Sequence, residues 1–245
     1  MKILVCIKPD VSGKEIGPFE SLALEAGLNI KESGLGAGTD SSRVDVITAG
    51  PPEWREIIGR AFGMGADRGV HVLTESDPSG LVPASVTAEL LVGAVAGLEE
   101  KSQYDLILFG VMSQDLMAGQ TGPMVAEHLG RPVITAGVRI ESMDTRLEVQ
   151  REWEGGVRET LDMPFPCVVT IQPGFFKPRY PRLSNMLKAK DKPIVKLIPR
   201  DIPKPKESFL ETVLPQKTRA GRIISGSSKD QVQAFNEFLR ERALL

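Results

Sequence analysis

One short stretch holds the residues of this sequence that are best suited to ligand chemistry. Residues 110–130, GVMSQDLMAGQTGPMVAEHLG, follow the apolar run YDLILF and precede another, PVITAGV. The implied order of strand, loop and helix places Gly119 to Gly122 where the helix begins. Backbone amides at a helix N-terminus, together with a small hydroxyl group, can cradle a phosphate. The local pattern equally fits a plain connection in which Thr121 only caps the helix, so both interpretations stay open at this point.

Side chains with the spacing of a known catalytic or metal site are missing from this sequence. His71, in an apolar run, and His128, in a helix-like segment, are not spaced with Cys, Asp or Glu as in a zinc site. Cys6 and Cys167 lie in apolar, strand-like runs, which favours core thiols over a disulfide or a CxxC metal site. GxSxG, Walker lysine and HExxH motifs do not occur. Asp115, near the loop, is the one candidate base for a nucleotide-hydrolysing enzyme.

A glycine-rich stretch at 34–40, GLGAGTD, comes before a strand-like run instead of after one. A dinucleotide-binding fingerprint needs a strand, a glycine turn and then a helix, so that backbone amides face the pyrophosphate. We therefore interpret this stretch as a loop between a helix and a strand.

Composition limits the classes of protein to which this chain can belong. With 245 residues, 41% apolar and 25% charged, it can bury one good core, as one large α/β domain or one domain with an appendage. Its 30 basic and 32 acidic residues leave a net charge of -2, so no general positive field favours nucleic acid or an anionic membrane. No apolar run reaches the roughly 18 residues of a membrane span, and the lysine-containing start MKILVCIKPD is unlike a signal peptide. We expect a soluble, cytoplasmic protein.

Apolar runs of strand length alternate with longer segments of helical spacing. The runs are KILVCIK, VDVITAG, GVHVLTE, YDLILFG, PVITAGVRI and PCVVTIQ. Helical segments separate the first four runs, and each begins at a proline, Pro18, Pro52 or Pro83, which fits the first turn of a helix. This alternation predicts βαβ units and therefore an α/β fold with a mostly parallel sheet.

The pattern changes after Val133. The stretch RLEVQREWEGGVRETLDM alternates polar and apolar residues on both sides of residues 154–156, which is typical of an antiparallel hairpin with one solvated face. From about Asp191 the chain is rich in proline and lysine and lacks a core-forming period, which indicates an extended arm. In the terminal helix that follows, Ser228 and Gln231 are the predicted capping pair. The apolar stripe of this helix, which must dock on its own domain or on a partner, comprises Val232, Phe235, Phe238 and Leu239.

The order and spacing of several segments, more than any one of them, point to a family. They are MKILVCIK, PFESLALEAGLNIKE, TAGPPEWREIIGRAFGMGADRGVHV, YDLILFG with DLMAGQTGPMVAEHLG, EWEGGVRETLDMPFPCVVTIQ and KPRYPRLSNMLKAKDKPI. Together they resemble the β subunit of electron transfer flavoproteins over nearly the whole chain. The segment PRYPRLSNMLKAK alone is close to a signature of that family.

This resemblance implies a Rossmann-like α/β domain of the adenine nucleotide alpha hydrolase type over residues 1–190, paired with a larger α subunit. It also implies that residues 191–245 form an arm and a helix that wrap the α subunit. Family members are electron carriers and not substrate-converting enzymes: they pass electrons from dehydrogenases, such as acyl-CoA dehydrogenases, to a quinone reductase or another acceptor. The α subunit holds most of the FAD, while the β subunit buries an adenine nucleotide, either AMP or a second FAD.

The resemblance also assigns binding residues. The segment DLMAGQTG matches the family's phosphate-binding loop, and Cys6 and Ala49 match positions that line the adenine. The phosphate-binding residues carried over to this sequence are Asp115, Ala118, Gly119, Gln120, Thr121 and Gly122. Because the resemblance and the helix-terminus argument agree, we prefer the phosphate cradle to the plain connection.

The segment 182–190, RLSNMLKAK, matches the family's recognition loop for dehydrogenases. Leu183 corresponds to the anchoring leucine, Met186 is a further expected partner-binding residue, and Lys188 and Lys190 supply positive charge. The alternative is that the apolar residues of this segment simply form the core face of a short helix.

Two departures from the family pattern bear on the cofactor. The first loop is short, because KPDVSGKEIGPFES joins the first strand directly to a helix, and Gly17 replaces the asparagine usual before Pro18. Both remove groups near the nucleotide or the flavin, so we expect AMP, or no second flavin, in this chain. The rival hypothesis is a stand-alone AMP- or ATP-binding module of the universal-stress-protein type. Such a module needs neither the proline-rich arm nor the terminal amphipathic helix.

Overall fold

The computed structural model of this chain describes residues 1–33, 42–75, 81–100, 102–143, 145–189, 192–211, 213–214, 221 and 223–244. They group into two compact units, Met1–Ser208 and Phe209–Leu245. The glycine-rich stretch 34–40 and the predicted partner residue Lys190 lie outside the described residues.

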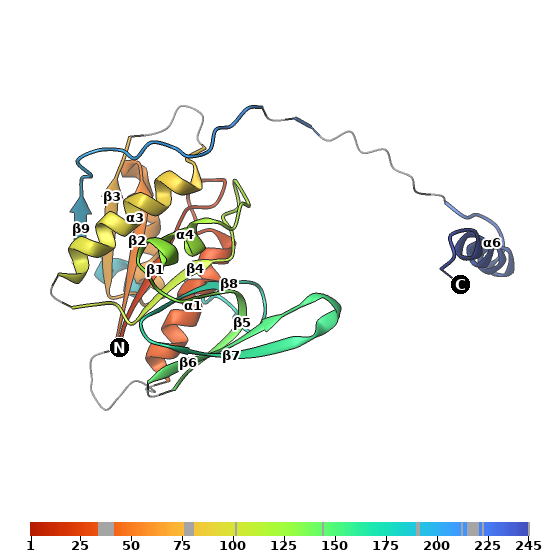
Figure 1. The fold of residues 1–245 in the computed structure, drawn as a ribbon, viewed down its shortest axis with the longest axis horizontal. Helices are drawn as coiled ribbons and strands as arrows, with labels where there is room; N and C mark the ends of the chain where they lie inside the picture. Colours follow the sequence, from red (N-terminus) through yellow and green to blue (C-terminus); the bar gives the residue numbers. More distant parts are fainter. Residues whose placement is uncertain are drawn as a thin grey trace. The chain divides into compact units, whose positions relative to one another are not determined.

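The larger unit is built on a sheet of nine strands within the described residues (Figure 1). The strands run in the order β7-β6-β5-β8-β4-β1-β2-β3-β9. They span β1 (Lys2–Cys6), β2 (Arg43–Gly50), β3 (Arg68–Leu73), β4 (Leu106–Gly110), β5 (Val133–Met143), β6 (Arg146–Glu152), β7 (Arg158–Pro164), β8 (Cys167–Ile171) and β9 (Ile194–Leu197). From β5 through β8 to β9 all neighbours are parallel, whereas β6 pairs antiparallel with both β5 and β7. The predicted α/β fold, mostly parallel with an antiparallel hairpin, is confirmed.

Helices connect the parallel strands, except the last helix, which follows β9. They are α1 (Pro18–Glu32), α2 (Arg55–Met64), α3 (Ala84–Glu99), α4 (Thr121–His128), α5 (Leu183–Lys188) and α6 (Ser228–Glu241), with short 3-10 turns η1 (Pro52–Trp54) and η2 (Glu154–Gly156). Pro18 occupies the first turn of α1, Pro52 opens the turn that leads into α2, and Pro83 is the N-cap of α3. The proline signals therefore mark all three helix starts. None of the helices in the described part of the chain is long and apolar enough to cross a membrane.

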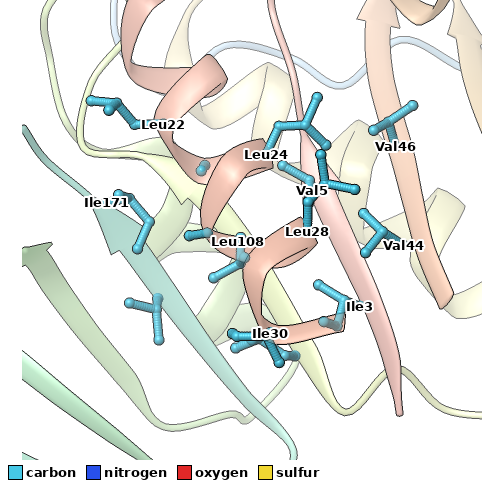
Figure 2. Close-up of a cluster of buried hydrophobic side chains, with 14 of the residues drawn as sticks. Ile3, Val5, Leu22, Leu24, Leu28, Ile30, Val44, Val46, Leu108 and Ile171 are labelled. Atoms are coloured by element: carbon cyan, nitrogen blue, oxygen red, sulfur yellow. The ribbon is translucent and has the colours of Figure 1, made fainter. Parts of the chain in front are cut away.

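Apolar cores lie on both faces of the parallel sheet. Because side chains alternate along a strand, Ile3 and Val5 of β1 join one core, while Leu4 and Cys6 join the other. Helices α1 and α2 cover the first face, where Figure 2 shows Leu24 of α1 lying close to Val5. Helices α3 and α4 cover the second face. Burial on both faces explains why β1 and β4 are almost continuous apolar runs in the sequence.

Strands β6 and β7 form the predicted hairpin. Their register pairs Glu152 with Arg158, and the chain reverses through η2 between them. Gly155 and Gly156 both have φ of 78°, in the left-handed region that glycine adopts without strain. The two adjacent glycines of EGG therefore permit the tight reversal that the sequence pattern predicts.

The segment after residue 190 does not begin as an unpaired arm. Its residues Ile194–Leu197 form β9, which extends the sheet in parallel beside β3. Further along, the Glu207 carboxylate accepts a hydrogen bond from the backbone N–H of Ser85 in α3 at 2.9 Å. The larger unit accordingly continues to Ser208. A four-residue strand at a sheet edge is too short for its period to be recognised in the sequence, so the expected arm contains a strand that we did not predict.

Helix α6, in the second unit, has a different cap from the predicted one. Ser227 is its N-cap: the Ser227 hydroxyl accepts from the backbone N–H of Asp230 at 3.4 Å, and the Asp230 carboxylate accepts from the Ser227 N–H at 3.1 Å. The predicted pair of Ser228 and Gln231 is therefore wrong by one residue. Because Ser227 and Ser228 are adjacent, the capping-box pattern fits the sequence in two ways, Ser227 with Asp230 or Ser228 with Gln231. The structure has the pair with the carboxylate, Ser227 with Asp230. Val232, in the predicted apolar stripe, is 61% exposed.

Candidate functional site

A cleft opens at the carboxyl ends of β4, β1 and β2. The chain runs from β1 through α1 to β2, but returns from β3 through α3 to β4 on the other side of β1. In open parallel sheets, ligands bind where the connections diverge in this way. The cleft contains about 790 Å³ of space, part of it open to solvent. All predicted binding residues except Asp115 line it, namely Cys6, Ala49, Ala118, Gly119, Gln120, Thr121 and Gly122.

The loop that connects β4 to α4 lines one end of the cleft with glycines. Gly119 has φ of 66°, and a Cβ atom on it would stand 3.2 Å from the carbonyl oxygen of Val111. A Cβ atom on Gly122 would stand 2.7 Å from Cγ2 of Thr170, so this position has no room for a side chain. The first amides of a helix lack partners within the helix. At one end of the cleft the start of α4 therefore presents N–H groups without partners in the helix, beside glycines that have no side chain, and this suits an anion such as phosphate.

Asp115 supports the site from outside the cleft. Its carboxylate lies 2.5 Å from Nζ of Lys8, which follows β1 and lines the cleft. Burial by itself would raise the pKa of Asp115, but hydrogen bonds from Lys8 and Ser113 bring that pKa below its ordinary value. An ionised carboxylate already paired with a lysine is poorly suited to act as a general base. Asp115 instead ties the loop after β4 to the loop after β1.

The lining residues that sequence patterns did not single out include Lys8, Glu20, Thr48 and Trp54. The ring of Trp54 lies against the end of β2, because a Cβ atom on Gly50 would stand 2.1 Å from its Cε3. Nζ of Lys8 lies 5.9 Å from the centre of the same ring. An aromatic ring in such a cleft provides a surface on which a base can stack. The only sequence signal for Trp54 was its place four residues after the strand-like run VDVITAG.

Glu20 and Thr48 carry buried polar atoms that the rest of the described chain does not satisfy. Glu20, in the first turn of α1, is 5% exposed, and Thr48, on β2, is 1% exposed. Neither Oε2 of Glu20 nor Oγ1 of Thr48 has a hydrogen-bond partner among the described residues. Burial raises the pKa of Glu20 to about 7. In the sequence Glu20 is indistinguishable from an ordinary acidic residue in the first turn of a helix.

His71 and the two cysteines are packed inside the fold. No cluster of His, Cys, Asp and Glu within the described ranges could hold a metal ion. Nε2 of His71 lies 3.1 Å from the carbonyl oxygen of Gly50 inside the sheet. Cys6 and Cys167 are free and buried, and burial raises the pKa of both thiols. Cys6 therefore contributes an apolar wall to the cleft, not a reactive thiolate.

The apolar residues of the predicted recognition segment lie on different sides of helix α5. Leu183 and Leu187 are 72% and 60% exposed. Met186 packs inward against α2, because a Cβ atom on Gly63 would stand 2.7 Å from its Cγ. The backbone N–H of Arg182 also donates to the carbonyl oxygen of Gly63 at 3.0 Å. The apolar residues of this segment do not share a single buried face, and the leucine matched to the family anchor points outward.

Arg179 fixes the chain just before this segment to α1. Its guanidinium contacts the Glu25 carboxylate at 2.9 Å and the Glu32 carboxylate at 2.6 Å. The Glu25 side chain is 8% exposed, so removing its partner would leave a buried charge unpaired. Arg179→Ala is expected to lower the free energy of unfolding by about 1–3 kcal/mol, measured by urea denaturation. The exposed Arg200→Ala variant is the control, and an Arg179 variant as stable as that control would contradict this role.

Comparison with known proteins places the chain in one family. A model of the electron transfer flavoprotein domain matches residues 7–201. The mitochondrial electron transfer flavoprotein subunit beta of Oryza sativa subsp. japonica is 34% identical, over 92% of this chain and 94% of that protein. The corresponding subunit of Homo sapiens is 33% identical, over 97% and 93%. That of Bacillus subtilis is 31% identical, over 93% and 86%. With matches that extend over nearly its full length, the chain belongs to the β-subunit family of electron transfer flavoproteins.

Proposed function

We propose that this chain pairs with an α subunit to form an electron transfer flavoprotein. The assembly would take electrons from dehydrogenases, such as acyl-CoA dehydrogenases, and deliver them to a quinone reductase or a similar acceptor. The observation that carries this proposal is the family match over most of the chain, together with a cleft at the switch point of the sheet. FAD, held mainly by the α subunit, supplies the redox chemistry, and this chain supplies position and electrostatics. A cytoplasmic location stays a prediction, because the relatives include mitochondrial proteins.

The cleft between β4, β1 and β2 suits one adenine mononucleotide, and we propose AMP as its occupant. The phosphate would bind the backbone between Gly119 and Thr121, where the start of α4 favours an anion. The base would lie towards Cys6 and Ala49. The unpartnered polar atoms of Glu20 and Thr48 suit an occupant that carries its own hydrogen-bonding groups, which an apolar molecule would not.

Helix α5 is the proposed contact for the dehydrogenase. Leu183 projects from the surface as an apolar anchor, and Lys188 and Lys190 would flank it with positive charge. Met186, which packs on α2, would hold the helix in position for that contact.

A stand-alone sensor of AMP or ATP, of the universal-stress-protein type, is the second candidate because it uses the same sheet and ligand position. Two surface features favour the carrier. Leu183 and Leu187 stand exposed on α5, and α6 carries an apolar stripe in which Val232 and Phe235 are exposed. A protein that works without partners has no need of either feature.

Cofactor content tests the proposed function directly. The chain is co-expressed with the α subunit, the complex is isolated by size-exclusion chromatography, and nucleotides released on denaturation are quantified. We expect one flavin and one AMP per αβ pair, because the short loop after β1 leaves fewer groups to contact a second flavin. Two flavins per pair would mean that a second FAD, and not AMP, occupies the cleft of this chain. A chain that stays monomeric and binds only AMP or ATP would support the stand-alone sensor.

A further inference from the structure

We propose that Glu20 and Thr48 form the recognition site for the nucleoside part of the bound nucleotide, with the Glu20 carboxyl group binding in its neutral form. The inference rests on the proposed function in one respect, that the occupant of the cleft is an adenine nucleotide. It assigns a chemical role to two side chains that no sequence pattern marks.

The first support is the state of the two polar atoms. Glu20 and Thr48 both line the cleft, and their atoms Oε2 and Oγ1 are buried without a hydrogen-bond partner among the described residues. Buried polar groups in folded proteins almost always have a partner, whether protein, water or ligand. A nucleoside brings both donors and acceptors into such a site. A phosphate brings mainly acceptors, so it could accept from an O–H group but could not donate to the carbonyl oxygen of a carboxyl group.

The second support is the glycine that makes room for the carboxyl group. A Cβ atom on Gly17 would stand 2.2 Å from Oε2 of Glu20 and 2.8 Å from its Cδ. Gly17 has φ of -52°, which any residue adopts, so its backbone does not require glycine. The absence of a side chain at position 17 is therefore explained by space: the carboxyl group of Glu20 occupies the place that a side chain there would take. Gly17 and Glu20 form one structural pair.

The third support is the charge environment of Glu20. The charged side chains that act on it are Lys8, after β1, and Asp115, after β4. Lys8 is held by Asp115 at 2.5 Å, so the two charges largely compensate one another at Glu20. Burial then dominates and raises the pKa of Glu20 to about 7. An occupant of the cleft excludes more water and favours the neutral form further.

A neutral carboxyl group fits adenine. It presents one O–H donor beside one carbonyl acceptor. Two edges of adenine present the complementary pair, because the exocyclic amino group lies beside N1 on one and beside N7 on the other. The hydroxyl of Thr48 can donate or accept, so it can bind a remaining base or ribose group.

The test is calorimetric titration of the full-length chain, freed of nucleotide, with adenosine across the range from about pH 5.5 to pH 8.5. Adenosine is used because the phosphate of AMP itself titrates near about pH 6. If the neutral carboxyl binds, adenosine affinity is constant below the pKa of about 7 and falls as the pH rises above it. The fall approaches about tenfold per pH unit. Glu20→Gln, which cannot ionise, should bind with a pH-independent affinity.

Two further variants separate recognition from folding. Gly17→Ala leaves Glu20 in the sequence but displaces its carboxyl group, so it should weaken adenosine binding by about tenfold, as Glu20→Leu should. Gly97→Ala, where a Cβ atom would meet no other atom within 4 Å, is the matched control and should bind normally. Binding of pyrophosphate should be the same in all of these proteins. Their melting temperatures report whether each variant is folded.

Several results would overturn the inference. They are a pH-independent adenosine affinity in the unchanged protein, normal adenosine binding by Glu20→Leu, or an equal loss of pyrophosphate binding in the Gly17→Ala variant. If the unchanged protein binds AMP while any of these holds, only the role of Glu20 and Thr48 fails. If the unchanged protein binds neither AMP nor adenosine, the proposed nucleotide site fails and the inference fails with it.

Discussion

Gly119→Asp is expected to lower the affinity for AMP by about a hundredfold or more. The substitution places a carboxylate where the phosphate would meet the first amides of α4, and two anions a few ångströms apart in a partly buried site repel each other strongly. Nucleotide retained by the purified protein, and AMP binding measured by calorimetry, report the effect. Unchanged nucleotide content would contradict the assignment of the phosphate to Gly119 to Gly122.

The matched control for this prediction is Gly119→Asn. Gly119 has φ of 66°, and a Cβ atom there lies 3.2 Å from the Val111 carbonyl oxygen, so any side chain brings some strain. Asparagine has nearly the same size as aspartate and tolerates this backbone conformation, but it carries no charge. We expect Gly119→Asn to keep most of the affinity. Equal losses in both variants would mean that strain, and not phosphate repulsion, explains the effect.

Leu183→Ala is expected to slow electron transfer from the dehydrogenase while leaving the melting temperature and flavin content near normal. Leu183 is 72% exposed, so its truncation removes little packing within this chain. An apolar anchor buried in a partner typically carries about 2 kcal/mol of binding, which corresponds to about thirtyfold in affinity. The rate of flavin reduction at subsaturating carrier concentration measures the loss. If Leu183→Ala unfolds the protein or leaves the rate untouched, this leucine is not the anchor.

Three neighbours supply the controls. Leu187→Ala removes a second exposed leucine from the same helix and should affect the rate less, if Leu183 is the anchor. Met186→Ala removes a side chain that packs on Gly63 and should lower the melting temperature instead. Lys188→Ala should mainly reduce the salt dependence of the rate, because charges at the rim of an interface act on association. A salt dependence unchanged in Lys188→Ala would exclude electrostatic attraction by this residue.

The sequence by itself determined the elements and their order. Hydrophobic period, prolines at helix starts and the EGG turn are local signals, and each acts through contacts within a few residues. For this reason the strands β1 to β8, the helix starts at Pro18, Pro52 and Pro83, and the hairpin at residues 154–156 were predictable. The loop at Gly119 to Gly122 was also predictable, because a strand followed by small residues and a helix places it at the carboxyl edge of the sheet.

Features whose signal is short or degenerate were missed. Strand β9, four residues long, takes its place from the free edge of β3 and not from any period of its own. The cap of α6 was placed one residue late because Ser227 and Ser228 are equivalent in a pattern, and only the hydrogen bonds to Asp230 distinguish them.

Only the tertiary structure decided which polar side chains face the cleft. Glu20 and Thr48 lie on separate elements, α1 and β2, and their burial depends on how α1 packs against the sheet. The same holds for the outward position of Leu183 and the inward position of Met186, which α2 imposes on α5. Gly17 shows the difference most clearly. In the sequence, Gly17 is only a position without a side chain. In the fold, the carboxyl group of Glu20 fills the space that a side chain at position 17 would take. Steric contact and desolvation act between atoms that only folding brings together, so the sequence alone could not show this.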